Sequence, residues 1–154
     1  MTTLQSGIPA NVTIAADRAN IGIAGQQRPD LIGGAPELNC QPNSGGATEA
    51  ARKQLINCYD PSAFALPAQF TFGSSPRNVV RGPDYKQTDL TLIKNIPLGK
   101  AARFQLRGEF YNLFNRANFA NPNTSFGSAA FGQITALATG ATMRRIQLGG
   151  RLIF

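Results

Sequence analysis

The sequence predicts an all-β chain in which antiparallel strands form part of an incomplete transmembrane β-barrel with long extracellular loops. Three observations lead to this fold class. The C-terminal half contains strictly alternating segments of about ten residues, which is the length of a tilted strand that crosses a bilayer. Proline, glycine and asparagine recur through most of the N-terminal half, where they interrupt any regular pattern. The last alternating segment ends on Phe154.

The composition narrows the class of protein. Charged residues make up only 15% of the 154 residues, against roughly 25% in a typical soluble domain. No stretch approaches the roughly 20 apolar residues of a transmembrane helix, so a membrane protein with this sequence must use strands. The net charge is +7, but the basic residues are scattered and accompany no nucleic-acid motif, which argues against nucleic acid as a partner.

The first ten residues (MTTLQSGIPA) lack the basic and apolar regions of a secretory signal. A barrel strand needs such a signal to reach the outer membrane. We therefore expect residues 1–154 to be the C-terminal segment of a longer barrel.

Residues 16–83 are predicted to form one long and largely irregular extracellular loop. Eight of the ten prolines precede Tyr85, and prolines at this frequency exclude long helices and strands. A loop of this length is unusual in a compact soluble domain but common in outer-membrane barrels. We expect one or two helical turns within residues 48–57 (TEAARKQLIN), because Thr48 can cap a helix and the following residues favour one.

Residues 87–114 are predicted to form a hairpin. Its first strand, residues 87–95, alternates weakly, and a turn at residues 97–100 (PLGK) leads to a stronger strand over residues 102–112. The apolar face of this second strand contains Ala102, Phe104, Leu106, Gly108 and Phe110. Its polar face contains Arg103, Gln105, Arg107, Glu109 and Tyr111.

A loop over residues 115–143 is expected to precede the final strand, residues 144–154. One face of this strand contains Ile146, Leu148, Gly150, Leu152 and Phe154, and the other contains Arg145, Gln147, Gly149 and Arg151. Alternating strands also build soluble sandwiches, so a small soluble or secreted β-domain that binds a partner through its loops is the alternative. The closely spaced charges and the terminal aromatic residue favour the barrel.

Four stretches of the chain resemble TonB-dependent outer-membrane receptors, in particular the Oar-like group with an N-terminal carboxypeptidase-regulatory-like domain. The densest likeness is residues 107–115 (RGEFYNLFN), which resemble the penultimate strand and the segment after it. The other stretches are residues 3–9 with 17–20, residues 77–83 with 88–95, and residues 118–123 with 131–134. The insert bounded by the two cysteines has no counterpart that we can align.

The resemblance implies a barrel of about 22 strands, of which this chain supplies three or four. It also implies that the segments 16–83 and 116–142 are extracellular and that the turn at residues 97–100 is periplasmic. The implied partners are outer-membrane lipid, the barrel-assembly machinery, the rest of the barrel and its plug domain. TonB itself would be contacted through the N-terminal part of the longer protein.

The polar faces supply the candidate lumen-facing residues, which are Arg103, Gln105, Arg107, Glu109 and Arg151. They either line a substrate path or contact a plug domain, or they are mutually paired charges in a wet lumen. Cys40 and Cys58 are a candidate disulfide, because an extracellular loop is oxidised, and two free thiols are the alternative.

No enzyme activity, cofactor or metal site is expected. The chain contains no histidine to act as a general base or metal ligand, and two cysteines do not complete a zinc site. The acidic residues of the strands are isolated from any nucleophile.

The end of the chain resembles the signal that the barrel-assembly machinery recognises, with Ile146, Leu148, Leu152 and Phe154 as its apolar positions. The alternative role of Phe154 is that of an aromatic residue at the membrane interface.

Deletion of Phe154 from the parent barrel should therefore lower its assembly, because the recognition signal loses its terminal aromatic ring. The measurement is the amount of heat-modifiable, folded protein on gels. Unchanged assembly would leave Phe154 with a lipid-contact role only.

Overall fold

The computed structural model describes residues 1–99 and 101–154, and it is an all-β structure. The chain divides into two compact units. The sheet unit comprises residues 1–5, 85–118 and 139–154, and the loop unit comprises residues 6–84 and 119–138. Within the described residues, no helix has both the length and the apolar character needed to cross a membrane.

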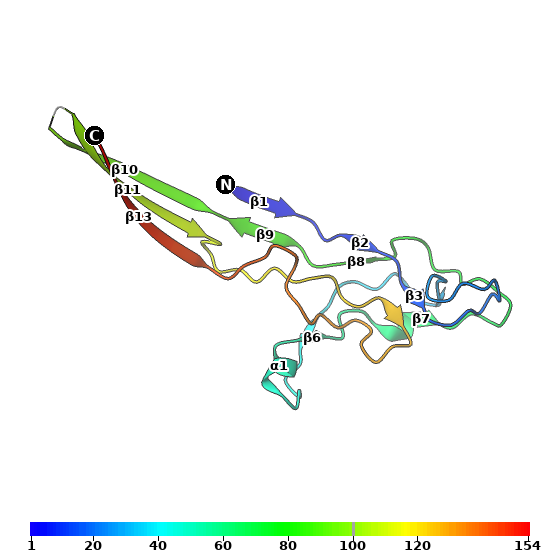
Figure 1. The fold of residues 1–154 in the computed structure, drawn as a ribbon. Helices are drawn as coiled ribbons and strands as arrows, with labels where there is room; N and C mark the ends of the chain where they lie inside the picture. The colour runs from blue at the N-terminus through cyan, green and yellow to red at the C-terminus, as the bar shows by residue number, and fades with distance from the viewer. Residues whose placement is uncertain (100) are drawn as a thin grey trace. The chain divides into compact units, whose positions relative to one another are not determined.

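The sheet unit contains five strands among its described residues (Figure 1): β1 (Thr2–Gln5), β9 (Tyr85–Thr88), β10 (Leu90–Leu98), β11 (Ala102–Tyr111) and β13 (Arg145–Ile153). Strands β10, β11 and β13 form a three-stranded antiparallel sheet with β11 in the centre. The sheet is open, with β10 and β13 at its edges, because three strands are too few to close a barrel. The predicted fold class, an incomplete antiparallel barrel, is confirmed.

The segment predicted as one strand over residues 87–95 is in fact two strands that part at Asp89. Strand β9 pairs with β1, whereas β10 pairs with β11. The backbone N–H of Asp89 donates to the carbonyl of Met1 at 2.8 Å, and its carboxylate accepts from the backbone N–H of Asn112 at 2.8 Å. Asp89 therefore bonds to the residue before β1 and to the residue after β11, at the point where the strand pairing changes.

Strand β10 continues into the segment predicted as a turn, residues 97–100. Pro97 and Leu98 belong to β10, and Gly99 has a φ of +82°. Proline has no N–H to give to a ladder, and the edge position of β10 is where a sheet tolerates it. Lys100, the last residue of the predicted turn, lies outside the described residues.

The segment after β11 (NLFN, residues 112–115) is a tight turn that depends on two asparagines in the left-handed region, Asn112 at φ +50° and Asn115 at φ +51°. The buried side chain of Asn112 donates to the carbonyls of Arg116 at 2.9 Å and Thr142 at 2.8 Å. Its oxygen accepts from the N–H of Arg116 at 2.9 Å. Asparagine suits this position because it tolerates positive φ and bonds to nearby backbone groups.

The loop unit is built from short elements around a small core: β2 (Pro9–Ala10), β3 (Thr13–Ile14), β4 (Asp30–Leu31), β5 (Gln41–Pro42), α1 (Glu49–Arg52), β6 (Leu55–Ile56), the 3-10 helix η1 (Pro61–Ala63), β7 (Phe64–Ala65), β8 (Val80–Arg81) and β12 (Ser125–Phe126). The pairs β2–β8, β4–β7 and β5–β6 are antiparallel, and β12–β3 is parallel. The core comprises Val12, Tyr59, Ala63, Phe64, Val79 and Val80.

Aromatic rings extend this core. Phe64, Phe126 and Phe131 contact one another with ring centroids 5.6 to 6.0 Å apart, in the tilted and edge-on geometries that aromatic pairs prefer. Two of these rings come from residues 119–138 and one from the segment predicted as an irregular loop. The segment 16–83 is therefore poor in regular structure, as predicted, but it is packed rather than unstructured.

The predicted helix within residues 48–57 is limited to the single turn α1, Glu49–Arg52. Leu55 and Ile56 instead form β6, and the N–H groups of Leu55 and Ile134 donate to each other's carbonyls at 3.0 and 2.7 Å. The structure therefore has the smaller of the two predicted helix lengths. The long-range pairing of Leu55 with Ile134 outweighs the helix propensity of the residues after α1, which is roughly a few tenths of a kcal/mol per residue.

Replacement of Asn112 tests the importance of the turn. We expect Asn112→Ala to lower the free energy of unfolding by about 2–4 kcal/mol, because buried backbone groups lose their partners and alanine disfavours positive φ. Asn112→Gly loses the same hydrogen bonds but tolerates the same φ, so it should cost about 1–2 kcal/mol less. The fraction of folded protein on unheated gels, followed against urea concentration, measures the free energy of unfolding of both variants. Equal decreases in the two variants would refute a contribution from the positive φ of Asn112.

Candidate functional site

The register of the sheet unit places all its predicted apolar positions on one face. Leu90 lies opposite Phe110 and Phe110 opposite Ile146, while Gly108 lies between Leu92 and Leu148. Directly opposite residues of antiparallel strands share a face, so this face also contains Ile96, Leu98, Ala102, Phe104, Leu106, Gly150 and Leu152, together with one charged residue, Lys94, opposite Leu106. Leu148 is 79% exposed and Ile146 is 56% exposed. We call this surface the apolar face.

Two glycines of the apolar face are covered by phenylalanine rings. A Cβ atom built on Gly150 would lie 3.0 Å from Cζ of Phe104, and one built on Gly108 would lie 3.4 Å from Cε2 of Phe110. The absence of a side chain therefore lets each ring lie close to the strand backbone. Such aromatic cover compensates for the packing that a glycine in a strand lacks.

The opposite surface, the polar face, contains the five candidate lumen residues. Arg103, Gln105, Arg107 and Glu109 lie on β11, and Arg151 lies opposite Gln105. The amide of Gln105 donates to the amide oxygen of Asn95 at 3.0 Å. Arg103 and Arg151 are exposed.

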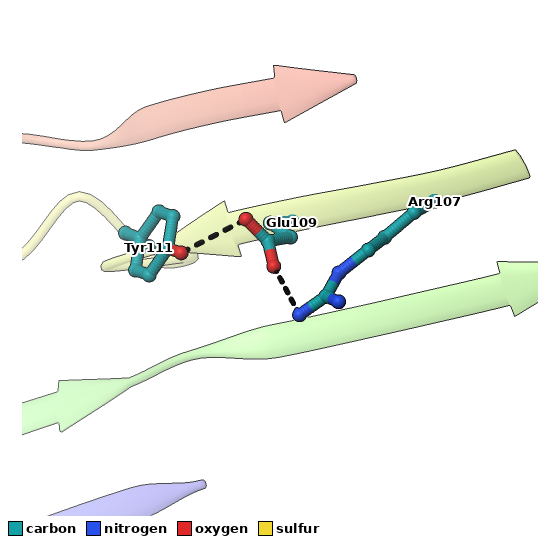
Figure 2. Close-up of polar contacts among 3 residues, drawn as sticks. All are labelled: Arg107, Glu109 and Tyr111. Atoms are coloured by element: carbon teal, nitrogen blue, oxygen red, sulfur yellow. Dashed lines mark hydrogen bonds and ion pairs between the residues drawn. The ribbon is translucent and has the colours of Figure 1, made fainter. Parts of the chain in front are cut away.

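The centre of the polar face is a cluster of four side chains, three of which Figure 2 shows. A guanidinium nitrogen of Arg107 lies 2.5 Å from one carboxylate oxygen of Glu109, and the hydroxyl of Tyr111 donates to the other at 2.9 Å. The guanidinium of Arg145 lies 4.7 Å from the centroid of the Tyr111 ring, within the range of a cation–π contact. The period of β11 places Arg107, Glu109 and Tyr111 on one face, and the register with β13 brings Arg145 opposite Tyr111.

The chemistry of the polar face is that of a wet, positively charged surface. Four arginines (Arg103, Arg107, Arg145 and Arg151) share it with one glutamate, Glu109, whose side chain is only 15% exposed. Two isoleucines also lie on this face, Ile93 opposite Arg107 and Ile153 opposite Arg103. Tyr111 and Arg145 are functional candidates that the list of lumen residues omitted. Their odd positions in the alternation already placed them on this face. Only the structure shows that the Tyr111 hydroxyl binds Glu109 and that the Arg145 guanidinium lies over the Tyr111 ring.

Cys40 and Cys58 form a disulfide in the loop unit. Cys58 is buried, its N–H donates to the carbonyl of Gly132 at 2.9 Å, and its carbonyl accepts from Asn39 at 3.0 Å. The disulfide closes a loop with a sequence separation of 18, which in the chain-entropy view stabilises the fold by roughly 3 kcal/mol. It fixes the segment that contains α1 and β6 to the core.

Tyr59 is next to this disulfide and is 1% exposed. Burial raises the pKa of its hydroxyl to about 12. The hydroxyl therefore stays protonated at neutral pH and donates to the carbonyl of Arg81 at 2.9 Å. This bond satisfies the one polar group that the ring brings into the core.

The residues of the predicted assembly signal lie along β13 and at its end. Ile146, Leu148 and Leu152 belong to the apolar face, and Phe154 follows the strand and is 90% exposed. Recognition by the assembly machinery stays a prediction. In the part of the chain that the structure describes, no three histidine, cysteine, aspartate or glutamate residues are grouped so that they could hold a metal ion.

An open antiparallel sheet with one exposed, largely apolar face and one charged face fits a segment of a membrane-spanning β-barrel. A model of the outer membrane beta barrel domain family matches residues 1–147. The chain belongs to this family, and its location is the outer membrane. No curated protein and no solved structure matches the chain significantly.

Charged substitutions on adjacent residues of β13 test the assignment of the two faces. Leu148→Arg places a charge on the apolar face and should cost about 2–4 kcal/mol of folding free energy in a bilayer. Gln147→Arg, the matched control, places the same charge opposite Glu109 and should change stability by less than about 0.5 kcal/mol. Urea titration of the barrel in lipid vesicles measures both values, and equal costs would contradict the assignment.

Proposed function

We propose that this chain is the structural C-terminal part of the barrel of a TonB-dependent outer-membrane transporter or receptor. The intact protein would import a scarce ligand through a plugged barrel with energy from the inner membrane. The observation that carries the proposal is the charged cluster on the polar face, because a lumen filled by a plug needs polar partners there. The likeness of residues 107–115 to this receptor group supports the same conclusion.

The polar face supplies what a plug domain would contact. Glu109 already binds Arg107 and Tyr111, whereas Arg103 and Arg151 are exposed. In this proposal the cluster around Glu109 keeps the sheet rigid, and the exposed arginines bind carboxylates or carbonyls of the plug. Arginine suits this role because its guanidinium presents several donors in a fixed plane.

The proposed topology places β13 and β10 on inward paths and β11 on an outward path. Segments 16–83 and 116–142 are then extracellular, and the turn between β10 and β11 is periplasmic. Short periplasmic turns and long outer loops are the rule for such barrels. The disulfide supports this placement, since Cys40 and Cys58 would then lie in an oxidising environment.

The remaining partners in the proposal are outer-membrane lipid on the apolar face, the barrel-assembly machinery at the end of β13, and the rest of the barrel at the strand edges. TonB would be contacted by the N-terminal part of the intact protein. We propose no catalytic activity and no cofactor. The alternative of a soluble or secreted β-domain gains no support from the family to which the chain belongs.

Photocrosslinking in intact cells tests whether the barrel contains a plug. A benzophenone side chain at Gln147, on the polar face, should form an adduct with a plug domain that precedes the barrel. The same group at Leu148, on the apolar face, should form no polypeptide adduct, because its surroundings are lipid. Peptide mass spectrometry of the adducts identifies the crosslinked segment.

The outcome that contradicts the proposal is a folded barrel, judged by heat-modifiable migration, in which Gln147 forms no polypeptide adduct. Such a barrel would be an open channel rather than a plugged transporter. An adduct at Leu148 but not at Gln147 would instead show that the two faces are reversed.

A further inference from the structure

The loop unit contains a recess between residues 21–28 and residues 72–77. Its volume is about 410 Å³, within the range of small-molecule sites. The walls include three apolar side chains, Ile21, Ile23 and Phe72, and two cationic ones, Arg28 and Arg77. Neither the polar face of the sheet nor the proposed transport function accounts for this recess.

The first wall is held in shape by Gln27, whose side chain is buried. Its amide oxygen accepts from the backbone N–H groups of Arg18 at 2.9 Å and Ala19 at 3.0 Å. Its amide nitrogen donates to the carbonyl of Ile23 at 3.2 Å and also to Asp17. The loop that contains Ile21 and Ile23 is therefore held around Gln27, whose amide oxygen and nitrogen both have hydrogen-bond partners.

The second wall is fixed by backbone contact. A Cβ atom built on Gly73 would lie 2.0 Å from the carbonyl oxygen of Arg28, so only glycine allows this approach. The N–H of Ser74 donates to Asp30 at 2.8 Å, and that of Asn78 donates to the side chain of Asn11 at 2.8 Å. The recess is thus preformed, which lowers the entropic cost of binding a ligand.

The charge of the recess is uncompensated. Its lining includes two arginines and no acidic side chain. Among the described residues, no ion pair or side-chain hydrogen bond engages the guanidinium of Arg28 or that of Arg77. The carboxylate of Asp17, on the same loop, accepts instead from the N–H groups of Ile21 at 3.1 Å and Gly22 at 2.7 Å.

The apolar side chains of the recess are also exposed to solvent. Ile21 is 49% exposed, Ile23 is 48% exposed and Phe72 is 69% exposed. Apolar surface in a concave site gains free energy when a ligand removes it from water, by about 25 cal/mol per Å². Two unpaired guanidiniums beside such surface select a ligand that is both anionic and apolar.

We propose that this recess binds a small amphiphilic anion, a carboxylate on an aromatic or alkyl body. Arg28 and Arg77 hold the carboxylate, and Ile21, Ile23 and Phe72 contact the apolar part. The proposal is independent of TonB-dependent transport, since it concerns the loop unit alone. A barrel that proves to have no plug would leave it intact.

Binding of 2-naphthoate to the protein in outer-membrane vesicles tests the site, with vesicles that lack the protein as the blank. The neutral methyl ester of 2-naphthoate tests the need for charge. Arg28→Gln and Arg77→Gln, alone and together, remove the cations without changing the apolar walls. Arg81→Gln is the matched control, because this exposed arginine of the loop unit does not line the recess.

We expect the double variant to bind naphthoate at least about tenfold more weakly, the size of a lost charge-assisted hydrogen bond. Phe72→Ala should also weaken binding, whereas Arg81→Gln should bind like the unchanged protein. Equal binding of the acid and its ester, or equal effects of the Arg81 and the double variant, would overturn the proposal. Tighter binding of 2-naphthyl phosphate than of 2-naphthoate would overturn the carboxylate assignment in favour of a phosphate ligand.

Discussion

The pairing of β11 with strands on both of its sides is the constraint on which the rest of the sheet unit depends. In a bilayer every backbone N–H and C=O must find a partner within the protein, and β11 meets this need through β10 on one side and β13 on the other. Since a one-residue slip would exchange the two faces, the register also decides which side chains meet lipid. The face assignment and the charged cluster both follow from this one arrangement.

The end of β11 shows how a membrane strand returns to polar surroundings. Asn112 turns the chain with positive φ and satisfies three backbone groups, while its own N–H donates to Asp89. A single buried residue thus connects the end of β11, the break between β9 and β10, and the approach to β13. The polar junction gives partners to the backbone N–H groups of Asn112 and Arg116 and to the carbonyls of Arg116 and Thr142.

The loop unit must be stable although it contains few regular secondary-structure elements. Small domains of this kind bury little surface and commonly rely on disulfides. Here the bond between Cys40 and Cys58, the aromatic cluster around Phe64 and close glycine contacts such as that of Gly73 replace long strands. Because the unit is packed, it can present a preformed recess, which a mobile loop could not.

The sequence by itself determined strands β11 and β13 and the chemical character of their faces, because alternation is a local property with a period of two. It also placed Arg107 and Glu109 on one face, since they are two residues apart. The tertiary structure decided the register, the division at Asp89, and the pairing of Leu55 with Ile134 that limits the helix to one turn. These features join residues far apart in the chain, and such contacts depend on shape and burial that no local pattern records.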